Sequence, residues 1–175
     1  PDGSANLATA IRAASDDRMR EAGGVYVAFD MELHAGRDVT KAHTSALGTF
    51  SSPGKGPVAS LDRERIRIHR PLGGYSRTLP ATRTDADVAT VRSGVGVGAR
   101  QVEAVLDRGV DGLVVEGTGL GNTTAAIGDA VAEAIGAGVP VVVGSRCHAG
   151  STAPVYGTAG GGLACFSALS GSLQG

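Results

Sequence analysis

Apolar positions in the first 70 residues follow two periods, one helical and one typical of strands. The helical period runs over residues 5–20 and stops at the pair Gly23-Gly24, which predicts one helix. Its apolar face has the spacing i, i+3, i+4 and i+7 and consists of Leu7, Ala10, Ile11 and Ala14. The β-branched and aromatic run "VYVAF" at residues 25–29 predicts a strand. Further on, "PVASL", "DRER" and "RIRIHR" predict a hairpin, because isoleucines there alternate with polar side chains.

Two stretches of the chain show no apolar period. The first, "DMELHAGRDVTKAHTSALGTFSSPGKG", is polar, and structureless segments of that length in compact proteins are usually functional loops. The second, residues 70–88, holds two prolines, two glycines and several hydroxyl side chains, a composition typical of linkers. We therefore place a first domain at residues 1–70, a linker at 71–87 and a second, smaller domain at 88–175.

Beyond the linker, strands and helices alternate. A weak strand at residues 88–97 precedes a helix with an apolar side, and "GLVVE" and "VPVVVG" are continuous apolar strands on either side of a second helix. The second helix carries its apolar side chains on one face: Ile127, Ala130, Val131, Ala134 and Ile135. Such alternation with continuous apolar strands predicts an α/β fold, with a parallel sheet covered by helices on both faces.

Composition excludes several classes of protein. Of the 175 residues, 42% are hydrophobic but only 3% aromatic, so the apolar material is mostly the small aliphatic kind that parallel sheets bury. The net charge of −1, without runs of like charge, points to neither a nucleic acid nor a membrane surface as partner. Two cysteines, Cys147 and Cys165, and four scattered histidines offer no metal-ligand spacing.

Ligands of open α/β sheets bind beyond the carboxyl ends of strands, which here points to residues 116–124 and 145–156. The first of these loops contains "GTGLGN", which suggests a nucleotide cradle. Its third glycine nevertheless comes one position too early for G-x-G-x-x-G, no acid ends the next strand, and no lysine follows. Three interpretations remain: nucleotide binding, a tight structural turn, or a substrate loop in which Asn122 offers its amide to a small polar molecule.

The other informative segment is "GRDVTKAHT" at residues 36–44, which crowds Arg37, Asp38, Thr40 and Lys41 together after a strand. One interpretation is a solvated charged loop. The other is that Lys41 is buried near a carboxylate and a hydroxyl, where a lowered pKa would let it take a proton from a Ser or Thr nucleophile. Spacing alone leaves both open.

Several of these segments resemble the bacterial-type L-asparaginases. "DGSANL" resembles the family's S-x-D-G-x-x-N-L helix entry, "GRDVTKAHT" its G-R-x-x-x-K-x-x-T segment, and "DGLVVEGTGLGN" its D-G-x-V-x-x-x-G-x-G-x-G-N loop. "GTFSSPGKGPVA" and "VPVVVGSRCHAGSTAPVYG" resemble later segments, so the resemblance is collinear over nearly the whole chain. It implies an α/β fold of two domains with parallel, flavodoxin- or Rossmann-like sheets flanked by helices, the first domain being incomplete.

The resemblance assigns roles to two residues. Lys41 matches the lysine of a Thr–Lys–Asp triad, which assists proton transfer. Asn122 matches an asparagine that reaches across a subunit interface to the substrate in a neighbour's active site. The nucleophilic threonine of the family lies in a T-G-G-T-I motif and its triad partners in T-D-T, and neither motif occurs in these 175 residues. We therefore expect a chain truncated at both ends that is inactive, or nearly so, by itself.

The implied activity is hydrolysis of L-asparagine to L-aspartate and ammonia through a threonine acyl-enzyme. The resemblance implies neither a metal nor an organic cofactor. The expected partners are L-asparagine and further copies of the chain, in a dimer of dimers with sites at the subunit interface. A glutaminase-asparaginase, the asparaginase-like subunit of a tRNA-dependent amidotransferase, and a non-catalytic α/β module that binds a small ligand stay open as alternatives. The compartment cannot be read from the sequence, because a secretory signal would lie upstream of Pro1. A cytoplasmic location is slightly favoured.

Overall fold

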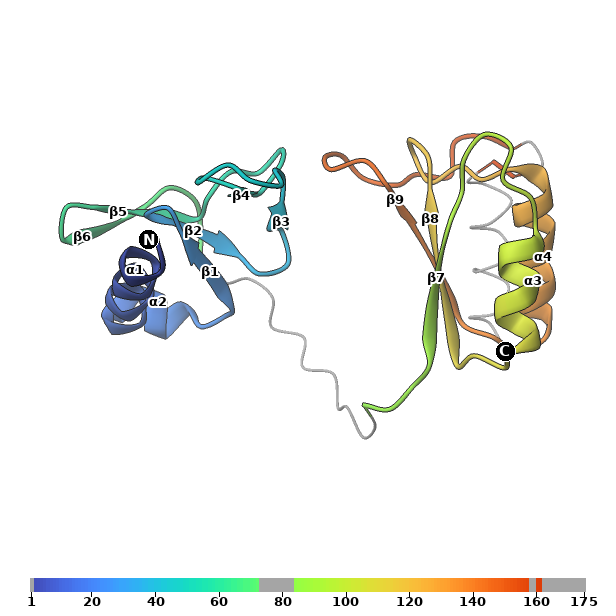
Figure 1. Cartoon of the computed structure of the whole chain (residues 1–175), viewed down its shortest axis with the longest axis horizontal. Coiled ribbons are helices and arrows are strands. Elements are labelled where there is room, and N and C mark those ends of the chain that lie inside the picture. The colour runs from blue at the N-terminus through green and yellow to red at the C-terminus, as the bar shows by residue number, and fades with distance from the viewer. Residues whose placement is uncertain (1, 73–83, 158–159, 162–175) are drawn as a thin grey trace. The chain divides into compact units, whose positions relative to one another are not determined.

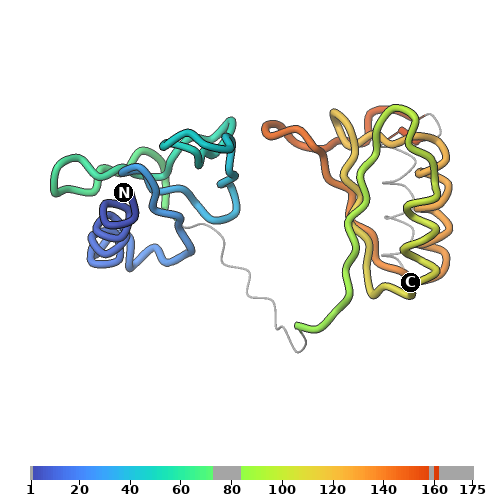
Figure 2. Tube along the Cα trace, viewed as in Figure 1, coloured from blue at the N-terminus to red at the C-terminus, as the bar shows by residue number. Residues whose placement is uncertain are grey.

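The computed structural model describes residues 2–72, 84–157 and 160–161, which belong to two compact units (Figure 1). The first unit comprises residues 1–80 and the second residues 81–175, and the backbone of each can be followed in Figure 2. Most of the predicted linker, residues 71–87, lies outside the described residues.

The first unit begins with two helices, α1 (Gly3–Ser15) and α2 (Asp17–Ala22), where the sequence predicts one. The break is at Asp16, whose backbone is extended and whose carboxylate accepts hydrogen bonds from the first amides of α2. The apolar face predicted for this helix does not pack on the unit's own core. Leu7 is 62% and Ile11 58% exposed, because the opposite side of α1 faces the core.

Four strands of the first unit form an antiparallel sheet in the order β1-β2-β5-β6. They are β1 (Tyr26–Phe29), β2 (Glu32–Ala35), β5 (Ala59–Asp62) and β6 (Arg65–Ile68). The parallel sheet expected in this domain is therefore not found among the described strands. The reason is local: two-residue turns join β1 to β2 and β5 to β6, and a link so short allows only antiparallel pairing. The hairpin predicted from the isoleucine pattern is confirmed as β5–β6.

The polar segment expected to be a long loop contains three strands. Besides β2, it forms a two-stranded ribbon of β3 (Thr40–Lys41) and β4 (Phe50–Ser51). Strand β2 does not follow the pattern of a half-buried strand, in which buried and exposed residues alternate, because Leu33, His34 and Ala35 are all buried in succession. Of these, Leu33 and Ala35 help to build the core of the first unit between α1, α2 and the sheet.

The second unit confirms the α/β prediction. Its strands β7 (Val88–Arg92), β8 (Gly112–Gly117) and β9 (Val141–Ser145) form a parallel sheet in that order. The connecting helices are α3 (Arg100–Asp107) and α4 (Ala125–Gly136), and their predicted apolar faces bury Val102, Ile127 and Val131 completely or nearly so. None of the helices in the described residues is long and apolar enough to cross a membrane.

Both described helices of the second unit lie on one face of the sheet (Figure 1), whereas helices on both faces were expected. The strand order explains the difference. It advances in one direction from β7 to β9, and right-handed crossovers that advance in one direction put their helices on the same face. Helices cover both faces only where the strand order reverses. The ligand-binding crevice of open α/β sheets forms at such a point of reversal, the topological switch point. The described strands of this unit contain no such reversal.

Candidate functional site

Lys41 lies on the short ribbon formed by β3, β4 and the residues between them (residues 40–51), which we call the Lys41 ribbon. Its backbone pairs with Phe50, and its side chain is exposed in an open hollow shared with the three residues that follow it. Among the described residues, none forms a hydrogen bond or ion pair with the Lys41 amine. The interpretation of Lys41 as buried beside a carboxylate is therefore wrong for this unit, and the amine is free to meet another molecule.

The turn of the Lys41 ribbon is ordered by hydrogen bonds. Nδ1 of His43 accepts the amides of Ser45 and Ala46 at 3.1 and 2.9 Å. The amide of Ala42 donates to the carbonyl of Thr49 at 2.7 Å, and the buried Thr49 hydroxyl donates to the carbonyl of His43. A ring nitrogen that accepts two amides carries no proton, so this arrangement requires the tautomer with hydrogen on Nε2.

The opposite end of the Lys41 ribbon is fixed by a buried carboxylate. Asp38 precedes β3 by two residues, and its side chain is only 2% exposed. Its two oxygens accept hydrogen bonds from Lys55 Nζ at 2.8 Å and from an Arg70 guanidinium nitrogen at 2.9 Å. The hydrogen bond from Lys55, assisted by that from Arg70, holds the pKa of Asp38 below its ordinary value although burial raises it. We call these three residues the Asp38 clamp.

A second buried contact joins the same region to β2. His34 is 1% exposed, with Nδ1 3.0 Å from the Ser52 hydroxyl and Nε2 3.2 Å from a Glu32 carboxylate oxygen. Serine, histidine and carboxylate in hydrogen-bond contact resemble a nucleophilic triad. Ser52 is only 4% exposed, however, so its hydroxyl is closed to a substrate and the contact is structural. Sequence reasoning missed it because Ser52 and His34 are 18 residues apart.

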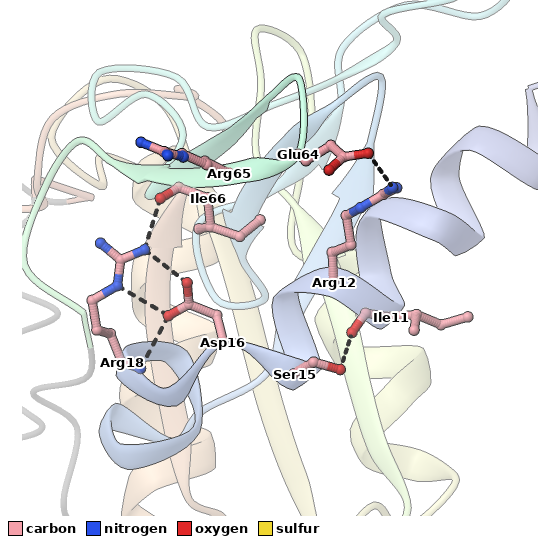
Figure 3. A pocket seen from close by; sticks show the side chains of 8 residues that line it. All are labelled: Ile11, Arg12, Ser15, Asp16, Arg18, Glu64, Arg65 and Ile66. Atoms are coloured by element: carbon pink, nitrogen blue, oxygen red, sulfur yellow. Dashed lines mark hydrogen bonds and ion pairs between the residues drawn. The ribbon is translucent and has the colours of Figure 1, made fainter.

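A hollow on another side of the first unit is also built of structural contacts (Figure 3). The guanidinium of Arg18 donates to the Asp16 carboxylate at 2.7 Å and to the carbonyl of Ile66 at 2.8 Å, which ties α2 to β6. The hydrogen bond from Arg18 holds the pKa of Asp16 below its ordinary value. The hydroxyl of Ser15, the possible nucleophile here, donates to a carbonyl of its own helix at 2.9 Å. This hollow therefore offers no assembled reactive group.

Asn122 lies in the loop between β8 and α4, residues 117–124, which we call the Asn122 loop. The amide of Asn122 donates to the carbonyl of Thr118 at 2.8 Å, and the amide of Thr118 donates back to the carbonyl of Asn122 at 2.8 Å. Gly117 permits this closure, because a Cβ there would lie 2.7 Å from the backbone carbon of Gly121. Gly119 and Gly121 have φ angles of 52° and 101°. The glycines are thus explained by a tight turn.

The backbone amides of the Asn122 loop are largely used within the unit. Besides the two already named, the amide of Gly121 donates to the carbonyl of Thr118, that of Thr123 to the carbonyl of Gly160, and that of Thr124 to the Ser93 hydroxyl. A phosphate cradle needs amides that point at the ligand instead. This geometry argues against nucleotide binding and leaves the structural turn and the substrate loop as the interpretations that fit.

The loop that follows β9 packs directly on the Asn122 loop. The Ser145 hydroxyl donates to the carbonyl of Gly119 at 2.5 Å, and the amides of Arg146 and Ala153 donate to the carbonyls of Gly117 and Leu120. The two loops singled out in the sequence lie at the carboxyl ends of β8 and β9, as predicted, and the structure adds that they contact each other there. Lys41 belongs to the first unit and Asn122 to the second. The described residues contain no group of three potential metal ligands.

Comparison with protein families gives two matches that together cover most of the chain. Residues 1–73 match the model described as "Asparaginase, N-terminal", and residues 87–173 match the "Glutaminase/Asparaginase C-terminal domain".

Individual relatives carry two kinds of name. L-asparaginase 2 of Escherichia coli is 31% identical over 156 residues, or 86% of this chain and 44% of the relative. A subunit of the glutamyl-tRNA(Gln) amidotransferase of Methanothermobacter thermautotrophicus is 32% identical over 153 residues, or 83% of this chain and 35% of the relative. A probable L-asparaginase of Deinococcus radiodurans is 32% identical over 142 residues, or 79% of this chain and 42% of the relative. The chain thus spans less than half the length of these relatives.

Proposed function

Because the chain belongs to the asparaginase family, we propose that it forms part of an L-asparaginase, which hydrolyses L-asparagine to L-aspartate and ammonia. A threonine attacks the side-chain amide, ammonia leaves from the tetrahedral intermediate, and water cleaves the resulting acyl-enzyme ester. Each step needs a group that moves a proton and a group that holds the amino-acid end of the substrate.

Lys41 is our candidate for moving the proton. The observation that carries the proposal is the match of residues 1–73 to the asparaginase N-terminal model, together with the place of Lys41 in that region. Its amine is exposed and has no partner among the described residues, while its backbone is held in the Lys41 ribbon. An amine so presented is available to a threonine hydroxyl and an aspartate supplied by other residues of the enzyme.

Asn122 is our candidate for binding the substrate. It is half-buried in a loop whose backbone is fixed by hydrogen bonds and which lies at the carboxyl ends of parallel strands. We propose that it contacts substrate in the active site of a neighbouring copy, in a homo-oligomer organised as a dimer of dimers. This proposal extends the resemblance of the glycine loop and is supported by the match of residues 87–173.

The 175 residues should show little or no turnover by themselves, because they contain neither a T-G-G-T-I nor a T-D-T motif. Losing the nucleophile of such a site typically costs several orders of magnitude in rate.

The test is ammonia release from L-asparagine, by the chain alone and by the product of the complete reading frame that contains it. We expect activity in the second only. It should fall by about 100-fold or more in Lys41→Ala and persist in the control Arg20→Ala, an exposed cation on α2. Ammonia release by the chain alone above its own Lys41→Ala variant would contradict the proposed inactivity.

A second function is favoured by the similarity to a glutamyl-tRNA(Gln) amidotransferase component, at 32% identity over 83% of the chain. In that case the product of the complete reading frame would serve such an amidotransferase. Asparagine hydrolysis without any further protein or tRNA supports the asparaginase, whereas activity that requires them supports the amidotransferase. Binding of aspartate without turnover by the complete product would instead favour a non-catalytic module.

A further inference from the structure

The Lys41 ribbon is too small to hold itself in place. Its ladder comprises two residues on each strand, and isolated two-stranded ribbons are at best marginally stable in water. Lys41 lies at the second of these positions and reaches solvent. The place from which its amine projects must therefore depend on contacts outside the ladder, which are the packing of the Phe50 ring on Phe29 of β1, with ring centroids 4.9 Å apart, and the contacts at the ends of the ribbon.

One end is closed by the turn around His43, and the other by the Asp38 clamp. Asp38 precedes β3 by two residues and Lys55 follows β4 by four, and because the strands are antiparallel both lie at the same end. The turn that carries Lys55 is itself closed by the amides of Lys55 and Gly56, which both donate to the carbonyl of Ser52. Arg70, just beyond β6, ties this end to the four-stranded sheet.

Burial makes the clamp specific in position. The Asp38 side chain is 2% exposed, and each oxygen has its own cationic donor. A buried carboxylate that loses either donor is left with one oxygen unpaired, so alternative placements of the segment are disfavoured. Lys55 remains 55% exposed and Arg70 24% exposed, so these two cations can regain water if the carboxylate is removed.

We propose that Asp38 is a positioning residue for the reaction, and that it acts only through Lys41 by fixing the ribbon from which the Lys41 amine projects. The proposal rests on the proposed function in one respect, namely that Lys41 moves a proton in the reaction. A displacement of about 1 Å at a group of that kind can lower a rate up to about 100-fold.

The first experiment concerns the structure and needs no activity. Amide hydrogen exchange is measured in the 175-residue chain and in its Asp38→Asn variant. Asp17→Asn, which breaks an exposed pair with Arg20, is the matched control. We expect the exchange rate of the Ala42 amide to rise in Asp38→Asn by a factor at least about tenfold larger than the factor for the amides between β1 and β2, with little change at either place in the control. Equal acceleration of both regions, or none, overturns the proposal.

If Asp38→Asn does not fold, Lys55→Ala, which keeps the Arg70 contact, is used in its place under the same criteria.

The second experiment is a double-mutant cycle in the product of the complete reading frame. We expect Asp38→Asn to lower kcat for asparagine about 10- to 100-fold with little change in KM, and to have no further effect when Lys41 is already alanine. Asp38→Glu, which keeps the charge, should restore part of kcat. An equal loss in both backgrounds means that Asp38 acts generally on the fold and overturns the proposal. If Lys41→Ala itself has no effect, the role of Lys41 in the proposed function fails, while the exchange result for the ribbon stands.

Discussion

The Lys41 ribbon and the Asn122 loop are both fixed, but by different means. The Lys41 ribbon depends on side chains: a buried carboxylate with two cationic donors at one end and the His43 ring at the other. The Asn122 loop depends on its backbone, with amides and carbonyls paired across a turn that glycine alone allows. Charge and protonation should therefore affect the first region, and added side-chain volume the second.

The difference follows from the surroundings of each segment. The Asn122 loop connects a buried parallel strand to a helix, so its ends are already held by the sheet and the apolar core of the second unit. The Lys41 ribbon has no core of its own, and of its residues Thr49 is the buried one. Long-range polar contacts, together with the packing of Phe50 on Phe29, must supply what apolar burial supplies in the other unit.

The largest effect is expected from Gly117→Ala. A Cβ at this position would lie 2.7 Å from the backbone carbon of Gly121 and 2.9 Å from the carbonyl oxygen of Asn122, so the turn must open. We expect a loss of about 3 kcal/mol in the free energy of unfolding of the second unit. Urea unfolding followed by the amide NMR signals of each unit measures this, since the chain has no tryptophan.

Gly144→Ala is the matched control for that variant. Gly144 pairs with Glu116 on the neighbouring strand, and a Cβ there meets nothing within 4 Å. Its unfolding free energy should change by less than about 0.5 kcal/mol. If the two variants are equally stable, steric closure does not hold the Asn122 loop and the comparison with the Lys41 ribbon fails.

Asp38→Asn should have the next largest effect, and on the first unit only. The amide keeps the shape of the carboxylate but loses its charge, and Lys55 and Arg70 can return partly to water. We expect a loss of about 2 kcal/mol in the stability of the first unit. Asp17→Asn should cost about 0.5 kcal/mol or less, because both side chains of the Asp17–Arg20 pair are mostly exposed. Equal losses in the two variants would show that burial of Asp38 contributes nothing.

How much the sequence predicts depends on whether a feature is local. The apolar faces around Val102 and Val131 and the hairpin around Ile66 follow from spacing within a few residues, and the structure confirms them. The clamp joins Asp38 to residues 17 and 32 positions away, and no period in the sequence links them. The exposure of Lys41 likewise depends on how the ribbon folds, so the segment alone left both a buried and an exposed lysine open.

Strand direction and helix placement show the same limit. The sheet of the first unit is antiparallel because two-residue turns at Asp30-Met31 and Arg63-Glu64 join its strands. Asp30, Met31 and Arg63 have positive φ angles although none of them is glycine, so the sequence carried no glycine that would mark these turns. The placement of α3 and α4 on one face follows from strand order, which apolar periodicity does not encode. Asn122 is a candidate because of its motif, and the structure adds the reason for the glycines around it.

Acid should also lower the stability of the first unit more than that of the second, but by less than Gly117→Ala or Asp38→Asn changes either unit. The pKa of Asp38 is lowered in the folded state, chiefly by Lys55, and that of Asp16 chiefly by Arg18. A lowered folded pKa gives stability that is present above the unfolded value, near 3.8, and is lost as the pH falls through the folded value. The first unit should therefore lose stability below about pH 4, while backbone bonds in the Asn122 loop do not titrate. Urea midpoints at about pH 6 and about pH 3 measure this, and Asp38→Asn should show a smaller difference. An unchanged difference in the variant would assign the acid sensitivity to other groups.

The smallest effect tests which property of the glycines matters in the Asn122 loop. Gly119 has a φ of 52° but open space around its missing Cβ, so a side chain there meets backbone strain without a clash. Gly119→Ala should cost about 1 kcal/mol in the second unit. Gly119→Asn should cost less than about 0.5 kcal/mol, because asparagine tolerates this backbone region. If alanine and asparagine cost the same at residue 119, the positive φ does not determine the cost at that position. The loop would then be held by steric closure at Gly117 and Gly121 alone.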